Sequence, residues 1–245
     1  MDMTKKIPSA DDQGLPWPEL FQGTLVKRYK RFLADVELDD GGLVTAHCPN
    51  SGAMNACSDP GRPVYLSFHD NPKRKLKYTW ELIHMPDSLV GVNTLVPNRL
   101  VKQAVENDLV AALKGYDRVR TEVKTSDHSR LDLLLEKDGN SDCFVEVKNC
   151  TLVEDRVARF PDAVTTRGRK HLVELQRLVA EGNRGVMFFL IQRMDADTFG
   201  PADHIDPAYG QELRNAHQKG VEILVYDVSI DLDSIRLNHC IPLVL

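Results

Sequence analysis

The sequence predicts an all-β N-terminal domain followed by an α/β domain, and three observations support this. Residues 20–85 hold short, apolar, β-branched segments with almost no helical periodicity. After Pro97, strand and helix patterns alternate along the chain. The wholly apolar segment 185–191 is typical of a central strand that is covered on both faces. We place the boundary between the two domains between residues 88 and 89.

The composition is that of an ordinary globular protein. The 245 residues are 42% hydrophobic and 27% charged, and 31 Lys and Arg against 36 Asp and Glu give a net charge of −5. This excludes a disordered chain and a globally basic nucleic-acid coat. No apolar stretch approaches the roughly 20 residues that a membrane span needs. The five widely spaced cysteines are not a disulfide framework, so we expect a cytoplasmic protein with no membrane partner.

The N-terminal part begins with a segment rich in proline and small polar residues, 1–19, which we interpret as a flexible leader. Five predicted strands follow, and turn residues such as Asp39-Asp40-Gly41-Gly42 separate them. Short strands in this number favour a five-stranded barrel of the OB type, although another small β-sandwich fits the same pattern. The predicted strands are 23–29, 32–38, 43–47, 64–68 and 78–85.

In the second part, residues that favour helix ends bound each predicted helix. Asn98 is a predicted N-cap, Gly182 ends the helix that begins near Thr165, and Gly220 follows the last helix. Strands alternate with these helices, which is the pattern of an α/β sheet covered on both faces. The predicted strands are 117–124, 130–136, 143–148, 185–191 and 221–228, and the last helix is 207–218.

Three chemically informative residues, Asp132, Glu146 and Lys148, lie on two neighbouring predicted strands. Because side chains alternate along a strand, Asp132 points away from the leucines at its sides, and Glu146 shares a face with Lys148. If the connecting turn is centred on Gly139, opposed residue numbers sum to 278, so Asp132 faces Glu146. Cross-strand neighbours of this kind are about 5 Å apart.

Two carboxylates at this distance repel each other, so one of them must take a proton or a cation must lie between them. Lys148 is one such cation, and a divalent metal is the other. Oxygen ligands suit Mg²⁺ or Mn²⁺. A metal beside a lysine is what phosphodiester hydrolysis requires, because both stabilise developing negative charge. A structural cluster of ion pairs is the alternative interpretation.

The spacing Asp-x13-Glu-x-Lys resembles that of the PD-(D/E)xK nuclease superfamily. The resemblance implies a restriction-endonuclease-like α/β/α domain with Asp132, Glu146 and Lys148 as catalytic residues, of which Asp132 and Glu146 hold the metal. Sites of this type often take a third carboxylate from the preceding helix, for which Glu106 and Asp108 are the candidates.

Longer segments between residues 20 and 228 are similar to the sugar fermentation stimulation protein A (SfsA) family. This resemblance implies an OB-like N-terminal domain, a nuclease-like C-terminal domain, DNA binding and a regulatory role in bacterial sugar (maltose) use. It maps the nuclease motif onto the same three residues, but Gln103 stands where a glutamate is expected. The segments are LVKRYKRFLADVE (25–37), HCPNSGAM (47–54), NPKRKLKYTWEL (71–82), GVNTLVPNRL (91–100), SRLDLLLE (129–136), CFVEVKN (143–149) and FPDAVTTRGRKHL (160–172).

Two basic clusters lie in the β domain of a chain that is acidic overall. OB barrels bind nucleic acid through a positive groove and aromatic rings, so we expect these clusters to contact double- or single-stranded DNA, with Tyr29 and Tyr78 beside them. Solvated strand ends are the alternative. Phe32 and Trp80 are expected in the barrel core, and six phosphate contacts would give log K a salt slope of about −5. The cations are Lys27, Arg28, Lys30, Arg31, Lys73, Arg74 and Lys75.

A third group of cations lies at the start of the helix near Thr165. Free backbone N–H groups at a helix start attract anions, so Arg167 and Lys170 are also predicted DNA contacts. His171 is either an acid or base, or a packing residue beside Leu175.

The remaining metal donors are His47, Cys48 and Cys57, which have no fourth ligand at a suitable spacing. We therefore expect the segment 47–52 to be a tight loop that lines a groove. The sequence leaves three functions open: a DNA nuclease that depends on Mg²⁺ or Mn²⁺, a regulator that binds DNA without cutting it, and a small-anion or nucleotide-binding module. A homodimer is also left open.

Overall fold

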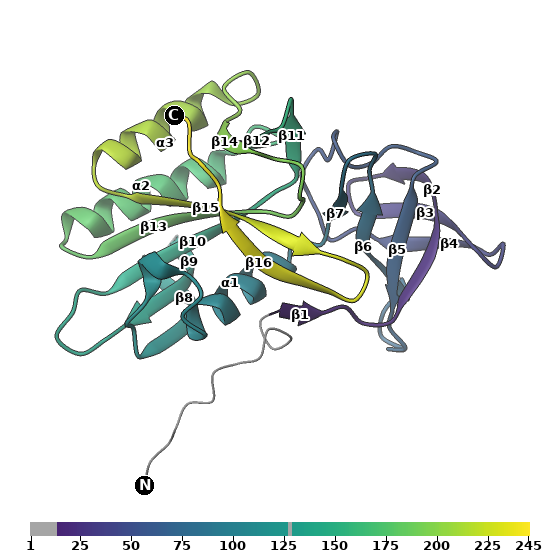
Figure 1. Ribbon diagram of the computed structural model, residues 1–245, viewed down its shortest axis with the longest axis horizontal. Coiled ribbons are helices and arrows are strands. Elements are labelled where there is room, and N and C mark those ends of the chain that lie inside the picture. Colours follow the sequence, from purple (N-terminus) through teal and green to yellow (C-terminus); the bar gives the residue numbers. More distant parts are fainter. Residues whose placement is uncertain (1–13, 127–128) are drawn as a thin grey trace, which may run out of the picture.

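The computed structural model describes residues 14–126 and 129–245, so the part of the predicted leader at 1–13 lies outside the described residues. The described chain forms a β-barrel and, beside it, a larger α/β domain (Figure 1). Within these ranges, no helix is both long and apolar enough to cross a bilayer.

Strands β2 to β6 form a closed five-stranded barrel, as predicted. Antiparallel pairings run in the order β4-β3-β2-β5-β6, and a parallel pairing of β4 with β6 closes the barrel. Because β7 pairs with β6, the barrel sheet extends to Gly91, past the predicted boundary at residue 88. The strands are β2 Leu20–Tyr29, β3 Leu33–Leu38, β4 Leu43–His47, β5 Pro63–Phe68, β6 Tyr78–His84 and β7 Leu89–Gly91.

The barrel core confirms one aromatic prediction and corrects another. Trp80 is fully buried, as expected from its apolar strand pattern. Phe32 is 49% exposed, because it lies in the turn between β2 and β3, where Lys30 and Arg31 have positive φ values of 49° and 63°. The tight turn places the ring outside the barrel.

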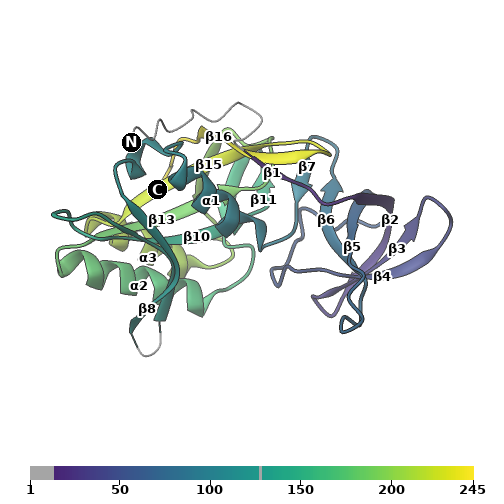
Figure 2. The same cartoon turned by 90° about the horizontal axis from the view of Figure 1, so that it is seen from below.

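The second unit is a seven-stranded sheet between helices (Figures 1 and 2). Its order is β1-β16-β15-β13-β10-β9-β8, in which β10, β13 and β15 run parallel. Helix α1 packs on one face, and α2 and α3 pack on the other, so each face has its own apolar core. The elements are β1 Gly14–Pro16, α1 Val96–Glu106, β8 Arg118–Ser126, β9 Ser129–Glu136, β10 Cys143–Cys150, α2 Thr166–Ala180, β13 Arg184–Ile191, α3 Pro207–Gln218, β15 Glu222–Ile230 and β16 Ser234–Cys240, with one 3-10 turn at Ala111–Leu113.

A small sheet that the sequence did not predict links β10 to α2. Its order is β11-β12-β14, and its strands are only three or four residues long, which is too short for a clear periodic signal. The strands are β11 Leu152–Glu154, β12 Val157–Phe160 and β14 Thr198–Pro201. The chain runs directly from β12 into the segment that begins α2, so this sheet fixes where α2 starts.

The prediction of a flexible leader is wrong for residues 14–17. Strand β1 pairs with β16, from Gly14 opposite Arg236 to Pro16 opposite Ser234. The indole N–H of Trp17 then donates to the carbonyl of Asp231 at 3.0 Å. Strand β16 would otherwise be an edge strand, and β1 pairs with its first three residues. The segment before the barrel is thus anchored to the α/β domain.

Candidate active site

The predicted register of the hairpin β9–β10 is confirmed where the two strands pair. Cys143 lies opposite Leu135, and Val145 lies opposite Leu133, so each pair of residue numbers sums to 278. The pairing ends there, one residue before Asp132 and Glu146. Instead, the backbone N–H of Val147 donates to Asp132 Oδ2 at 2.8 Å. The carboxylate itself therefore joins the two strands at the point where they separate.

The same separation corrects the expected facing of one leucine. The strand period predicts one face for Leu131, Leu133 and Leu135. Leu133 and Leu135 do pack together in the core beneath α1, but Leu131 packs in the core beneath α2. Before Leu133 the strand β9 pairs only with β8, so the simple two-residue alternation does not extend across Asp132.

Asn98 fixes the other oxygen of Asp132 and does not cap its helix. Helix α1 starts at Val96 with Leu95 as its N-cap and Pro97 in its first turn, a position that suits proline. The prediction of Asn98 as the N-cap is therefore wrong, because the helix begins before it. Since Asn98 lies inside the helix, its side chain is free to donate to Asp132 Oδ1 at 2.7 Å.

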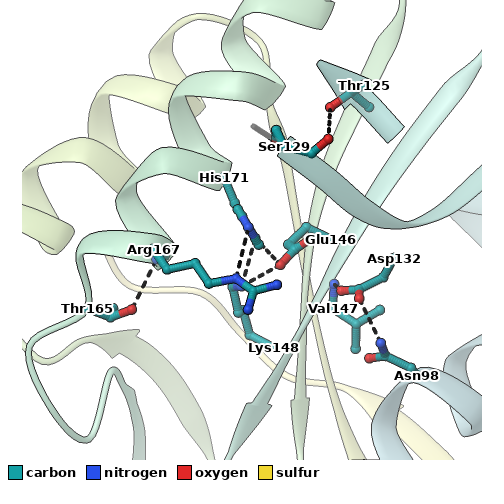
Figure 3. Close-up of polar contacts among 11 residues, drawn as sticks. Asn98, Thr125, Ser129, Asp132, Glu146, Val147, Lys148, Thr165, Arg167 and His171 are labelled. Atoms are coloured by element: carbon teal, nitrogen blue, oxygen red, sulfur yellow. Dashed lines mark hydrogen bonds and ion pairs between the residues drawn. The ribbon is translucent and has the colours of Figure 1, made fainter. Parts of the chain in front are cut away.

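Glu146 is 3% exposed and is held by two basic side chains (Figure 3). Lys148 Nζ donates to Glu146 Oε1 at 2.5 Å, and His171 Nδ1 contacts the same oxygen. Lys148 Nζ and His171 Nδ1 are 3.3 Å apart. The second oxygen, Glu146 Oε2, is buried and has no hydrogen-bond partner in the described part of the chain.

The two carboxyl groups have pKa values that are shifted in opposite directions. Burial and the negative charge of Glu146 raise the pKa of Asp132 to about 6, and the contacts with Val147, Lys148 and Asn98 only partly oppose this. Burial also raises the pKa of Glu146, but the hydrogen bond from His171 and the charge of Lys148 outweigh it, so the net shift is downward. Because burial and like charge raise the pKa of Asp132, a positive ion beside it would favour the ionised form of both groups.

These features fit a hard divalent cation. One buried oxygen of Glu146 has no partner among the described residues. The neighbouring carboxylate, Asp132, has a pKa that is raised by burial and like charge. Together these two observations indicate a site that lacks positive charge. Among the described residues no group of three His, Cys, Asp or Glu side chains is placed to hold a metal. A metal held by Asp132 and Glu146 would need water or backbone oxygens as its other ligands, which is the ligand set that Mg²⁺ accepts.

Neither candidate for a third carboxylate lies at the site. Glu106 is exposed and forms an ion pair with Lys102 one turn earlier in α1. Asp108 is exposed beyond the end of the helix. Gln103, which stands where the family resemblance predicts a glutamate, donates to the carbonyl of Gly14 at 3.3 Å. Helix α1 thus contributes an amide, that of Asn98, and no acid.

The site lies in a cleft of about 460 Å³ between the barrel and the α/β domain. The barrel contributes Arg31 and the loop 50–52, which confirms that the segment after His47 lines a groove. Asp162 connects the two sides, because its Oδ2 accepts the backbone N–H of Met54 at 3.0 Å. A Cβ atom on Gly52 would lie 2.3 Å from the same carboxylate, so only glycine permits this close approach.

The basic residues that were predicted to contact DNA fall into three groups. Arg31 and Arg167 line the cleft, and Lys170 lines a neighbouring cavity that also contains Arg167. Lys30, Lys73 and Lys75 are exposed, and Lys27 is exposed beside Asp35, 3.6 Å away. Arg74 donates to Thr79 Oγ1 at 2.7 Å and lines a cavity on the far side of the segment 93–99.

Arg28 has a structural role that the sequence did not predict. Its two terminal nitrogens donate to four backbone carbonyls at 2.8–3.0 Å. Three of these carbonyls belong to the loop 50–53, which lines the cleft. A β-bulge between Leu25 and Lys27 turns the strand so that Arg28 reaches this loop. The two terminal nitrogens are therefore already hydrogen-bonded, whereas the buried Nε has no partner among the described residues.

His171 is the site residue whose role the sequence left undecided. It is 6% exposed and lies on the second turn of α2, whose N-cap Thr165 accepts the backbone N–H of Gly168. Arg167, one turn earlier, donates to His171 Nε2 at 3.5 Å. The one sequence signal is the four-residue spacing of these two side chains, which places them on one helix face.

Two family profiles match consecutive parts of the chain. The SfsA N-terminal OB domain matches residues 26–92, and the sugar fermentation stimulation protein RE domain matches residues 95–234. The chain belongs to the sugar fermentation stimulation protein family. The family's domain boundary, between residues 92 and 95, agrees with the end of β7 at Gly91.

Relatives in the family match nearly the whole chain. A sugar fermentation stimulation protein homolog from Geobacter sulfurreducens is 56% identical and covers 93% of this chain and 97% of its own. The homolog from Geotalea uraniireducens is 55% identical and covers 91% of this chain and 96% of its own. The solved structure of Pyrococcus furiosus SfsA in complex with Ca²⁺ has a TM-score of 0.87 at 25% identity and covers 95% of this chain and 99% of its own.

Proposed function

We propose that this protein binds DNA and hydrolyses its phosphodiester bonds with the help of Mg²⁺ or Mn²⁺. The observation that carries the proposal is the convergence of Asp132, Glu146 and Lys148 in one open cleft, with a buried Glu146 oxygen that lacks a partner among the described residues. A structural ion-pair cluster would satisfy both oxygens of its buried acid, because an unpaired buried oxygen is costly. A cation-binding site, in contrast, would leave one carboxylate oxygen unpaired for the cation, as Glu146 Oε2 is among the described residues.

Each side chain has a defined part in this chemistry. Asp132 and Glu146 would hold the metal, which when bound supplies positive charge for the phosphate and lowers the pKa of a water ligand. The Val147 N–H and the Asn98 amide orient the Asp132 carboxylate. Lys148 Nζ holds and orients the attacking water, and its charge stabilises the negative charge that develops on the phosphate.

Other residues position these groups and the substrate. His171 orients Glu146, since it contacts the oxygen that Lys148 also contacts. Arg31 from the barrel and Arg167 from α2 line the cleft from different domains and supply charge for a DNA backbone. Single- or double-stranded DNA carries the phosphates that this arrangement would bind.

The relative from Pyrococcus furiosus supports the choice of a hard cation. Its solved structure is a complex with Ca²⁺, and it shares the fold of this chain at 25% identity. Ca²⁺, Mg²⁺ and Mn²⁺ all prefer oxygen ligands, but Ca²⁺ tolerates irregular geometry. We therefore expect Ca²⁺ to bind this chain and Mg²⁺ or Mn²⁺ to support hydrolysis.

One observation favours a second function, that of a DNA-binding regulator that cuts nothing. Lys148 and His171 both contact the same oxygen of Glu146, and α1 provides no third carboxylate. A site with only two acids would bind its metal more weakly than one with three. In this case the link to sugar (maltose) metabolism, which the family name suggests, would come from regulation.

Incubation of the purified protein with supercoiled plasmid and Mn²⁺ separates the two functions. The proposal predicts nicked and linear products with the wild type, and a loss of at least about 100-fold in Asp132→Ala and Lys148→Ala. The matched controls are Asp138→Ala and Lys137→Ala, in the turn between β9 and β10. Salt-sensitive DNA binding without any cleavage would instead support the regulator.

A further inference from the structure

A second cavity, of about 460 Å³, lies next to the catalytic cleft. The two cavities share Arg167 and His171 as lining residues. In Figure 3, Ser129 and Thr125 lie at the top of the view, and Glu146, Asp132 and Lys148 lie below them. The second cavity therefore adjoins the candidate active site but is lined by neither of its carboxylates.

The described residues that line this cavity carry only positive charge. Among them, four side chains are cationic, three carry hydroxyl groups, and none is acidic. In a chain with a net charge of −5, such a group is a strong local exception. The lining residues are Lys124, Arg130, Lys170 and Arg167, with Ser126, Ser129, Thr166 and His171.

Two details indicate that the cavity suits an anion with several oxygens. The hydroxyl of Ser129 is buried and has no hydrogen-bond partner within the described residues, so a donor is available there. Arg130 contacts Glu122 at 3.6 Å, but both side chains are about 60% exposed, so this pair is weak and easily exchanged for a better one. The start of α2 also contributes, because its first backbone N–H groups form the positive end of the helix dipole and Thr166 there lines the cavity.

We infer that this cavity binds a second phosphate of the DNA strand whose neighbouring phosphodiester lies in the catalytic cleft. The inference rests on the proposed function and adds how the substrate is placed. Arg167, which lines both cavities, would lie between the two phosphates, while Lys170 and Arg130 would contact only the second. The second phosphate is either an internal one or the terminal phosphate of a strand end, and both present the same oxygens to the cavity.

The test compares Lys170→Glu with the matched charge reversal Lys114→Glu, which lies on an exposed surface after the 3-10 turn. Binding of a fluorescent oligonucleotide is measured by anisotropy in EDTA, so that neither metal nor cleavage is required. We expect Lys170→Glu to weaken binding at least about 10-fold more than Lys114→Glu. We also expect Lys170→Ala to reduce the slope of log K against log salt by about 0.9, the value for one phosphate.

Two otherwise identical oligonucleotides, one with and one without a terminal phosphate, show which phosphate the cavity binds. The affinity of each variant is measured for both strands. If the phosphorylated strand binds more tightly and Lys170→Glu removes the difference, the cavity binds a strand end. If Lys170→Glu weakens both strands equally, it binds an internal phosphate. Equal affinities of Lys170→Glu and Lys114→Glu for both strands would overturn the inference.

The outcome is independent of catalysis. A wild type that cleaves no plasmid with Mn²⁺, but still loses DNA binding selectively in Lys170→Glu, would refute the nuclease and leave the phosphate cavity standing. A wild type that cleaves, with Lys170→Glu equal to Lys114→Glu in binding, would refute the cavity alone. Thermal unfolding of both variants checks that the charge reversals leave the fold intact.

Discussion

Asp132 Oδ2 accepts the backbone N–H of Val147, the residue that follows Glu146, at 2.8 Å. This hydrogen bond connects the two strands where their regular pairing has ended, next to both acids. Burial of the Asp132 carboxylate lowers the stability of the folded protein when the group is ionised. Burial and the charge of Glu146 raise its pKa to about 6. This loss of stability gives the first prediction.

Without bound metal, Asp132→Asn should stabilise the protein at neutral pH. Between pH 3.8 and about 6 the folded protein keeps a proton on Asp132 that the unfolded chain has lost, so stability falls as the pH rises through this range. The shift corresponds to about 3 kcal/mol at most, since each pKa unit is about 1.4 kcal/mol. Urea unfolding in EDTA at pH 4 and pH 7 measures it.

Asp138→Asn, in the exposed turn between β9 and β10, is the control for this measurement. The Asp132→Asn protein should lose little of its stability between pH 4 and pH 7, whereas the control should follow the wild type. An unchanged loss of stability in Asp132→Asn would mean that Asp132 does not carry the raised pKa.

Arg28 should matter for stability and not for the salt dependence of DNA binding. Arg28→Lys keeps the charge but cannot reach all four carbonyls, so we expect a loss of about 2–3 kcal/mol in the free energy of unfolding. Lys27→Ala, which removes an exposed ion pair, should cost less than about 1 kcal/mol. A stable Arg28→Lys protein with weakened DNA binding would show that Arg28 contacts phosphate after all.

Most of the fold was predictable because long elements carry strong periodic signals. The five barrel strands, the apolar strand β13 and helix α3 lie where the pattern of apolar residues placed them. Strand β1 and the small β11–β12–β14 sheet were missed, since three or four residues do not define a period and their pairing depends on distant partners. The family resemblance supplied the nuclease-like topology.

The candidate site was predictable in part for a similar reason. The register of β9 and β10 follows from the turn at Gly139, so local spacing placed Asp132 near Glu146. The contacts of Arg28 depend on a β-bulge, and those of His171 and Asn98 depend on how α2 and α1 pack on the sheet. Sequence spacing places His171 on one helix face with Arg167, but it does not show the contacts that depend on the bulge or on helix packing. Charge alone therefore suggested that Arg28 contacts DNA.

His171 should act as a positioning residue for the metal. If it orients Glu146, His171→Ala should weaken Mn²⁺ binding by about 10- to 100-fold, which is typical of residues that hold a metal ligand. Isothermal titration calorimetry measures the affinity, and His217→Ala, exposed on α3, is the control. A purely structural histidine would lower the melting temperature and leave the Mn²⁺ affinity of the folded protein unchanged.

The central claim is that Asp132 and Glu146 hold one divalent cation in a cleft that is open to DNA. Anomalous diffraction from crystals soaked in Mn²⁺ tests it most directly. The account predicts a single strong peak within bonding distance of both carboxylates in the wild type and none in Asp132→Asn. A wild-type crystal with no peak there, in which Glu146 remains closed against Lys148 and His171, would contradict it.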